Sequence, residues 1–302
     1  MLRSKARVTP ATRSVSFHYE KLFSLHAFGS CATFSICHRA YWADLACNDV
    51  GDVVMTSAAF TLRDVTLGYD GHPAVHHLDG EISKGSLTAI VGPNGSGKST
   101  LLKGLIGALE PMGGSIERNG FQTHDIAYLP QASEIERSFP ATVEDLVTLG
   151  LWRRRGFLQS IIQSDRKDVS KALQAVGLDG FEGRSIGTLS GGQLQRALFA
   201  RVLLQDAKVI LLDEPFTAID SKTVSDLIAL VQRWHAEQRT IIAVLHDIEL
   251  VRDTFPEAVL LAREPVAWGK TSDALKPENL LKARRMNEAW DETAPWCEAG
   301  AA

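Results

Sequence analysis

The stretch Gly92-Pro93-Asn94-Gly95-Ser96-Gly97-Lys98-Ser99-Thr100 follows the apolar run Leu87 to Val91 and precedes apolar residues at helical spacing. This order of strand, glycine-rich loop and helix is the one that a phosphate-binding P-loop requires. Glycines allow backbone N–H groups to approach phosphate oxygens closely, and a helix N-terminus attracts the same anion. The stretch therefore predicts a nucleotide site in which Lys98 reaches the β- and γ-phosphates and the Ser99 hydroxyl ligates Mg²⁺.

The composition of the chain limits the classes of protein to consider. Its 302 residues leave room for one large domain or two small ones, and an apolar content of 45% with 23% charged residues is ordinary for a globular protein. A net charge of −4 argues against a general nucleic-acid binder, so no nucleic-acid partner is expected. No apolar run approaches the roughly 18 residues that cross a bilayer, so we expect any membrane role to depend on a partner.

The first 54 residues differ from the rest of the chain. They hold six basic and four acidic residues without a helical or strand period, and Met55 is followed at once by periodic sequence. We interpret this segment as a disordered leader, or as upstream translation from a misassigned start with Met55 as the natural one. A targeting peptide and a zinc site are alternatives, although the segment lacks an uninterrupted apolar region and the C-x₂-C pattern. The zinc site would draw on His18, His26, Cys31, Cys37, His38 and Cys47.

The remaining sequence predicts strands first, then helices, then an alternation of the two. Short strands with a turn at Asp70-Gly71 are expected from Phe60 to Val91, and a further strand from Ser115 to Arg118. Residues 131 to about 190 favour helices, one opened by a near capping box at Thr142 and one over Asp168 to Val176. After these, short apolar strands alternate with helices, which implies a parallel sheet covered on both faces. The expected helices are 193–205, 222–237 and 247–254, and the expected strands are 209–212, 240–245 and 258–262.

Two acidic residues end one of the buried strands. The run from Val209 to Leu212 is followed by Asp213-Glu214-Pro215, and ligands bind at this carboxyl end of a parallel sheet. Asp213 suits the coordination of Mg²⁺, and Glu214 suits the orientation or deprotonation of an attacking water. The alternative is a pair of acids that merely cap a strand.

A second glycine-rich helix start lies in Leu189-Ser190-Gly191-Gly192-Gln193-Leu194-Gln195-Arg196. Ser190 is the expected N-cap, and the free N–H groups of the first turn could bind an anion. The sequence therefore contains two anion-binding helix starts but one expected Mg²⁺ site.

Together these three stretches resemble the ATP-binding subunits of ABC transporters, over about residues 58 to 270. The resemblance implies an α/β fold, namely a P-loop NTPase ABC cassette with a RecA-like parallel-sheet core, an antiparallel β subdomain and a helical subdomain at about 131–190. It implies an ATPase domain over 55–270 and a C-terminal tail over 271–302, in which Pro277 marks a helix start.

The resemblance also implies the roles of single residues. Tyr69 would stack on adenine, Gln131 would sense Mg²⁺ and couple to the membrane subunit, and Asp220 would cross a dimer interface. His246 would contact the γ-phosphate. The implied catalytic residues are Lys98, Gln131, Glu214 and His246, and the implied Mg²⁺ ligands are Ser99, Gln131 and Asp213. The implied nucleotide-binding residues are Tyr69, Gly92, Pro93, Asn94, Gly95, Ser96, Gly97, Lys98, Ser99, Thr100, Ser190, Gly191, Gly192, Gln193 and Asp220.

In this family two subunits pack head-to-tail, and the signature helix of one closes over the ATP held by the other. The resemblance thus implies a homodimer that hydrolyses ATP at the cytoplasmic face of the membrane. The implied partners are integral membrane permease subunits and a separate substrate-binding protein.

The residues around Gln131 indicate which subgroup of the family the chain resembles. Tyr128 to Gln131, Glu134 to Pro140, Thr142 to Val147 and Gly150 to Trp152 are similar to the ATPases of zinc and manganese importers. Import of an iron chelate or cobalamin, or a role in iron–sulfur assembly without a membrane partner, remain alternatives. We interpret His72, His76, His77 and His124 as solvated surface residues rather than metal ligands.

Overall fold

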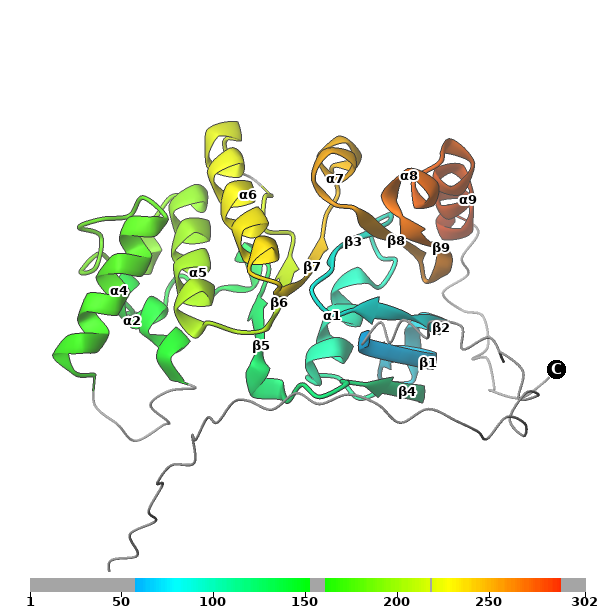
Figure 1. The fold of residues 1–302 in the computed structure, drawn as a ribbon, viewed down its shortest axis with the longest axis horizontal. Helices are drawn as coiled ribbons and strands as arrows, with labels where there is room; N and C mark the ends of the chain where they lie inside the picture. Colours follow the sequence, from blue (N-terminus) through cyan, green and yellow to red (C-terminus); the bar gives the residue numbers. More distant parts are fainter. Residues whose placement is uncertain (1–57, 153–160, 218, 289–302) are drawn as a thin grey trace, which may run out of the picture. The chain divides into compact units, whose positions relative to one another are not determined.

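The computed structural model describes residues 58–152, 161–217 and 219–288, so the leader and its zinc and targeting alternatives lie outside the described residues. Its larger sheet has the strand order β5-β6-β7-β3-β8-β9 (Figure 1). The first five strands are parallel, and β9 pairs antiparallel with β8. The strands are β3 (Leu87–Val91), β5 (Ile126–Leu129), β6 (Val209–Asp213), β7 (Thr240–Val244), β8 (Glu257–Ala262) and β9 (Glu264–Lys270).

Both faces of the parallel sheet are buried, which explains the continuous apolar runs of its strands. Successive side chains of a strand point to opposite faces. In β6, accordingly, Val209 and Leu211 belong to one hydrophobic core and Ile210 and Leu212 to another. The expected parallel sheet covered on both faces is confirmed.

One face is covered by helix α1 (Lys98–Ile106) and a smaller antiparallel sheet of order β2-β1-β4 (Figure 1). Strands β1 (Ala58–Tyr69) and β2 (His72–Ser83) form a long hairpin around the expected Asp70-Gly71 turn, and β4 (Gly113–Glu117) pairs with β1. Because α1 follows the P-loop directly, this packing fixes the loop between the two sheets.

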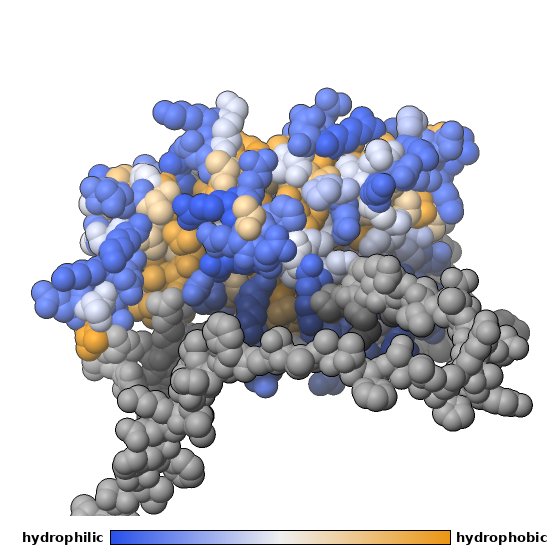
Figure 2. Space-filling view, viewed as in Figure 1, coloured by the Kyte–Doolittle hydropathy of each residue, from blue (hydrophilic) through white to orange (hydrophobic). Residues whose placement is uncertain are grey.

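Helices cover the opposite face (Figure 1). They are α5 (Gly191–Gln205), α6 (Ser221–Ala236), α7 (Ile248–Thr254), α8 (Thr271–Ala274) and α9 (Pro277–Glu288), whereas α2 (Val143–Thr148) and α4 (Gln163–Ala175) lie beside α5. α2 and α4 pack against α5. The ring of Trp234 on α6 stacks on the ring of Phe199 on α5, with 5.9 Å between the ring centroids. On the face drawn in Figure 2 the protruding surface is mostly hydrophilic, and hydrophobic residues are visible mainly in the recesses between helices.

Two helix starts follow from local hydrogen bonds. Thr142 caps α2 and accepts a hydrogen bond from the backbone N–H of Asp145, as the sequence predicts. In contrast, α4 begins at Gln163 rather than at the predicted Asp168. Its N-cap is Ile162, whose backbone N–H is bound by the Asp165 carboxylate at 2.9 Å, so the cap is made without a polar N-cap side chain.

The C-terminal part packs on the sheet more extensively than the sequence indicates. Residues 264–270, for which the sequence predicts no element, form the edge strand β9. α9 begins at Pro277 as predicted, and Ala274, Leu275 and Ala283 are buried in the same core as the sheet. These buried side chains tie residues 271–286 to β8 and β9.

The described histidines do not form a metal site. Exposure is confirmed for His72, His77 and His124, but the prediction for His76 is wrong: its side chain is buried, because β2 packs there against the turn between β8 and β9. Within the described residues no cluster of three or more His, Cys, Asp or Glu could hold a metal ion. Nor does any helix in these ranges combine the length and apolar character that traversing a bilayer demands.

Candidate functional site

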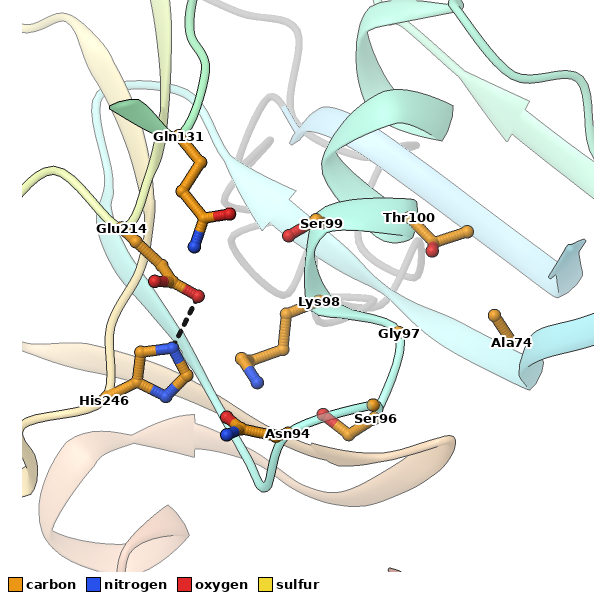
Figure 3. Close-up of a pocket in the computed structure, with 11 residues that line it drawn as sticks. Ala74, Asn94, Ser96, Gly97, Lys98, Ser99, Thr100, Gln131, Glu214 and His246 are labelled. Carbon is orange, nitrogen blue, oxygen red and sulfur yellow. Dashed lines mark hydrogen bonds and ion pairs between the residues drawn. The ribbon is translucent and has the colours of Figure 1, made fainter. Parts of the chain in front are cut away.

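A cavity of about 840 Å³ opens over the P-loop (Figure 3). It lies where β3, β5, β6 and β7 end and α1 begins, so it occupies the carboxyl edge of the parallel sheet. The residues that line it are Ala74, Asn94, Gly95, Ser96, Gly97, Lys98, Ser99, Thr100, Gln131, Glu214 and His246.

Two glycines give the P-loop its shape. A Cβ at Gly92 would lie 1.9 Å from the carbonyl oxygen of Leu261, so no larger residue fits between the loop and β8. Gly97 has a left-handed φ of 88° and is the N-cap of α1, where no side chain caps the helix. The first-turn N–H groups of α1 are therefore not occupied by a capping side chain and can bind an anion.

The side chain of Lys98 is held inside the loop. It is 6% exposed, and its Nζ donates hydrogen bonds to the carbonyl oxygens of Gly92 at 3.0 Å and Pro93 at 2.8 Å. Burial lowers the pKa of Lys98, while the nearby carboxylates of Glu214 and Asp213 oppose that shift. Ser96 adds a fully buried Oγ that has no hydrogen-bond partner among the described residues. An ammonium and an unpaired hydroxyl in one loop fit the oxygens of a phosphate chain.

Asp213 ends β6 and is 1% exposed. Its Oδ1 accepts a hydrogen bond from the Ser99 hydroxyl at 3.0 Å, and its Oδ2 accepts one from the Tyr128 hydroxyl at 3.3 Å. Burial raises the pKa of Asp213, and these two hydrogen bonds act in the opposite direction. A hydroxyl and a carboxylate side by side are hard oxygen ligands of the type that Mg²⁺ prefers, so this pair fits the implied metal ion.

Glu214 follows with a left-handed φ of 46°, and its N–H donates to the carbonyl oxygen of Val244 at 3.2 Å. Its Oε1 lies 2.6 Å from Nε2 of His246 (Figure 3). Its Oε2 accepts a hydrogen bond from the Thr217 hydroxyl at 3.3 Å. Burial raises the pKa of Glu214, but the hydrogen bonds from His246 and Gln131 outweigh it and hold the pKa below its ordinary value. The side chain is therefore ionised at neutral pH, as a general base requires.

The cavity thus brings together Lys98, Ser99, Gln131, Glu214 and His246, which the sequence places far apart. Their roles in binding and catalysis stay predictions. Sequence reasoning did not identify Tyr128 as a partner of Asp213. The only signal was its place in the apolar run before Pro130 and Gln131, and the sequence of a strand does not indicate which strand will be its neighbour.

The other predicted nucleotide contacts lie away from this cavity. Ser190 and Gln193 form a reciprocal capping box at the start of α5, and Asp220 caps α6 by accepting from the N–H of Thr223 at 2.9 Å. Gly191 lines a second cavity of about 740 Å³, which also has Gln131 and Glu214 in its wall. Tyr69 is 47% exposed and is not among the residues that line the P-loop cavity.

The chain is similar in sequence to ATP-binding proteins of metal transport systems. The family model described as "ABC transporter" matches residues 75–217. The manganese transport system ATP-binding protein MntA of Synechocystis is 40% identical over 232 residues, which cover 73% of this chain and 89% of that protein. The zinc transport system ATP-binding protein TroB of Treponema pallidum is 33% identical over 238 residues, covering 78% of this chain and 90% of that protein.

Solved structures agree with the fold. A metal-chelate type ABC transporter in an inward-facing conformation is similar with a TM-score of 0.67 and 28% identity, over 76% of this chain and 89% of that one. An ATP-binding cassette solved as a dimer in a post-hydrolysis state, bound to ADP and phosphate, has a TM-score of 0.61 at 24% identity, over 70% of this chain and 98% of that one. The latter likeness concerns the fold alone.

Proposed function

Because the chain belongs to the ATP-binding subunits of ABC transporters, we propose that its ATPase activity drives the import of manganese or zinc through a separate membrane permease. The observation that carries the choice of metal is the 40% identity to a manganese transport ATP-binding protein. The 33% identity to a zinc transport ATP-binding protein supports the same class of substrate. The permease and a substrate-binding protein would supply the selectivity, because the described residues of this chain hold no metal-ligand cluster.

The residues of the cavity suit the hydrolysis of ATP. The N–H groups at the start of α1 and the ammonium of Lys98 would hold the phosphate oxygens and stabilise the charge of the transition state. Glu214 would accept the proton of the attacking water, and His246, 2.6 Å from its Oε1, would orient this carboxylate. Ser99, Asp213 and Gln131 would hold Mg²⁺, which when bound would neutralise charge on the β- and γ-phosphates.

The position of the second helix start supports a dimer. Ser190 and Asp220 do not line the P-loop cavity, although the family resemblance assigns both to nucleotide contacts. A head-to-tail pair of identical chains would bring the α5 start of one chain to the P-loop of the other. We therefore propose a homodimer, bound peripherally to its permease at the cytoplasmic face of the membrane.

A second candidate is the import of a metal chelate. It is favoured by the similarity, at 28% identity, to the solved metal-chelate type transporter. The two candidates share the ATPase chemistry and differ in the cargo that the partner proteins select.

The growth of a strain that lacks the gene tests the choice between a free metal ion and a metal chelate as the imported substrate. Under chelation the strain should fail to grow, and it should recover when manganese or zinc alone is added at high concentration. The same strain carrying a Lys98→Ala copy should behave like the deletion, whereas an intact copy should restore growth. Rescue by an iron chelate and not by either free metal would favour the second candidate and refute the first.

A further inference from the structure

The carboxylate of Asp213 is held from two sides. The hydroxyl of Ser99, at the start of α1, donates to Oδ1 at 3.0 Å, and the hydroxyl of Tyr128, on β5, donates to Oδ2 at 3.3 Å. A carboxylate with one donor can still turn about its last side-chain bond, whereas donors on both oxygens fix the plane of the group. Asp213 is 1% exposed, so little water reaches it to replace a lost donor.

The sheet places Tyr128 where its hydroxyl can reach Asp213. Tyr128 pairs with Leu211 in the parallel ladder of β5 and β6, and Leu211 precedes Asp213 by two residues. Residues two apart in a strand share a face, so Tyr128, Leu211 and Asp213 lie on the same side of the sheet. The backbone carbonyl of Tyr128 accepts a hydrogen bond from the Arg201 guanidinium of α5 at 2.6 Å, which holds this point of the strand in place.

Tyr128 is close to the site without being part of its wall. It is half-buried and is not among the residues that line the P-loop cavity. Asp213 is not among those residues either, but it bonds to Ser99, which is, so the hydroxyl of Tyr128 is linked to the cavity through Asp213 and Ser99. This separates Tyr128 from Ser99, which both bonds Asp213 and faces the cavity.

We propose that Tyr128 is a positioning residue, which holds the Asp213 carboxylate in the orientation that coordinates Mg²⁺ together with Ser99. This inference rests on the proposed function, since it needs a site that binds ATP with Mg²⁺. Removing a group that orients a metal ligand by a hydrogen bond typically lowers metal affinity or activity by about 10- to 100-fold. Tyr128 should accordingly matter for nucleotide binding only when the metal is present.

Binding of ATP by the full chain, measured by calorimetry with excess Mg²⁺ and again with EDTA, tests the proposal. In Tyr128→Phe the affinity for ATP with Mg²⁺ should fall about tenfold, the effect of one hydrogen bond to a charged acceptor. The affinity for ATP in EDTA should stay within about twofold of the native value, because Asp213 then has no metal ion to coordinate. Thr88→Val is the matched control: it removes a buried hydroxyl from β3 of the same sheet, one that donates to Glu257 instead, and it should change neither affinity.

A double-mutant cycle with Asp213→Asn separates positioning from folding. In that background Tyr128→Phe should have no further effect on binding with Mg²⁺, because the carboxylate that it orients is gone. An equal loss in EDTA and in Mg²⁺, a loss that persists in Asp213→Asn, or a failure of Tyr128→Phe to fold would each assign Tyr128 to the structure and overturn the proposal. Native affinity of Tyr128→Phe in both media would overturn it as well. If the native chain itself binds no ATP, the proposed function fails.

Discussion

Replacing Glu214 with glutamine tests the assignment of the catalytic base with little change in shape. The native carboxylate lies 2.6 Å from Nε2 of His246 through Oε1 and accepts from Thr217 through Oε2. A glutamine keeps one acceptor oxygen and the same length, and its amide can still form one of these bonds. It cannot accept a proton from water. We therefore expect a folded protein that binds ATP and turns it over slowly.

The expected loss in kcat follows from the role of Glu214 as a general base. General-base catalysis by a positioned side chain typically contributes about 10²- to 10⁴-fold to a rate. At 1.36 kcal/mol for each factor of ten, this corresponds to roughly 3 to 5 kcal/mol of the activation barrier. The affinity for ATP should change by less than about threefold, because Glu214 is acidic and does not hold the phosphates. If closure of two subunits precedes hydrolysis, the variant should also accumulate as an ATP-bound dimer.

Three measurements check this prediction. Steady-state phosphate release gives kcat, equilibrium titration gives the affinity for ATP, and size-exclusion chromatography with ATP and Mg²⁺ gives the oligomeric state. Glu110→Gln is a suitable control, because Glu110 is exposed and lies outside the cavity, so its activity should equal that of the native chain. A kcat within threefold of the native value in Glu214→Gln would refute the assignment of Glu214 as the base.

Three further predictions follow from the packing and charges. Gly92→Ala should abolish ATP binding and lower the free energy of unfolding, because its Cβ would lie 1.9 Å from the Leu261 carbonyl oxygen; an unchanged denaturant midpoint would contradict this. Trp234→Ala should lower the free energy of unfolding, measured with urea, by about 3 to 5 kcal/mol, since this fully buried ring stacks on Phe199. The pKa of Glu214 lies below its ordinary value, so its charge stabilises the fold above about pH 4.5 and the benefit is lost as the pH falls through the lowered pKa. The difference in Tm between the native chain and Glu214→Gln should therefore shrink as the pH falls below the ordinary glutamate pKa of about 4.5, and a constant difference would refute this.

The parts of the fold that sequence predicts well are those determined by local chemistry. The apolar runs before Gly92 and Asp213 form β3 and β6 as expected, because strands buried on both faces need no alternation. The helix starts at Thr142 and Ser190 were predicted correctly because a polar N-cap with an acid or amide three residues later is a short-range signal.

Other features depend on partners that a local pattern does not reveal. Strand β9 contains Pro265 and Gly269, which are typical of loops, but an edge strand tolerates proline because one of its sides has no partner. The burial of His76 depends on the packing of β2 against the turn at Arg263, which is distant in the sequence. Likewise the hydrogen bond from Tyr128 to Asp213 exists because β5 and β6 are neighbours, and strand order is a property of the whole sheet.

The two cavities share a wall, and this bears on how hydrolysis could be controlled. Gln131 and Glu214 line the P-loop cavity on one side and, on the other, the cavity beside the start of α5. Gln131 also lies two residues after the end of β5, whose Tyr128 bonds to Asp213, and its hydrogen bond contributes to the lowered pKa of Glu214. A displacement of the segment around Gln131 would therefore alter both the carboxylate assigned to Mg²⁺ and the carboxylate assigned as base. Since the family resemblance implies that Gln131 couples to the membrane subunit, this one segment is where the state of a permease could set the rate of hydrolysis.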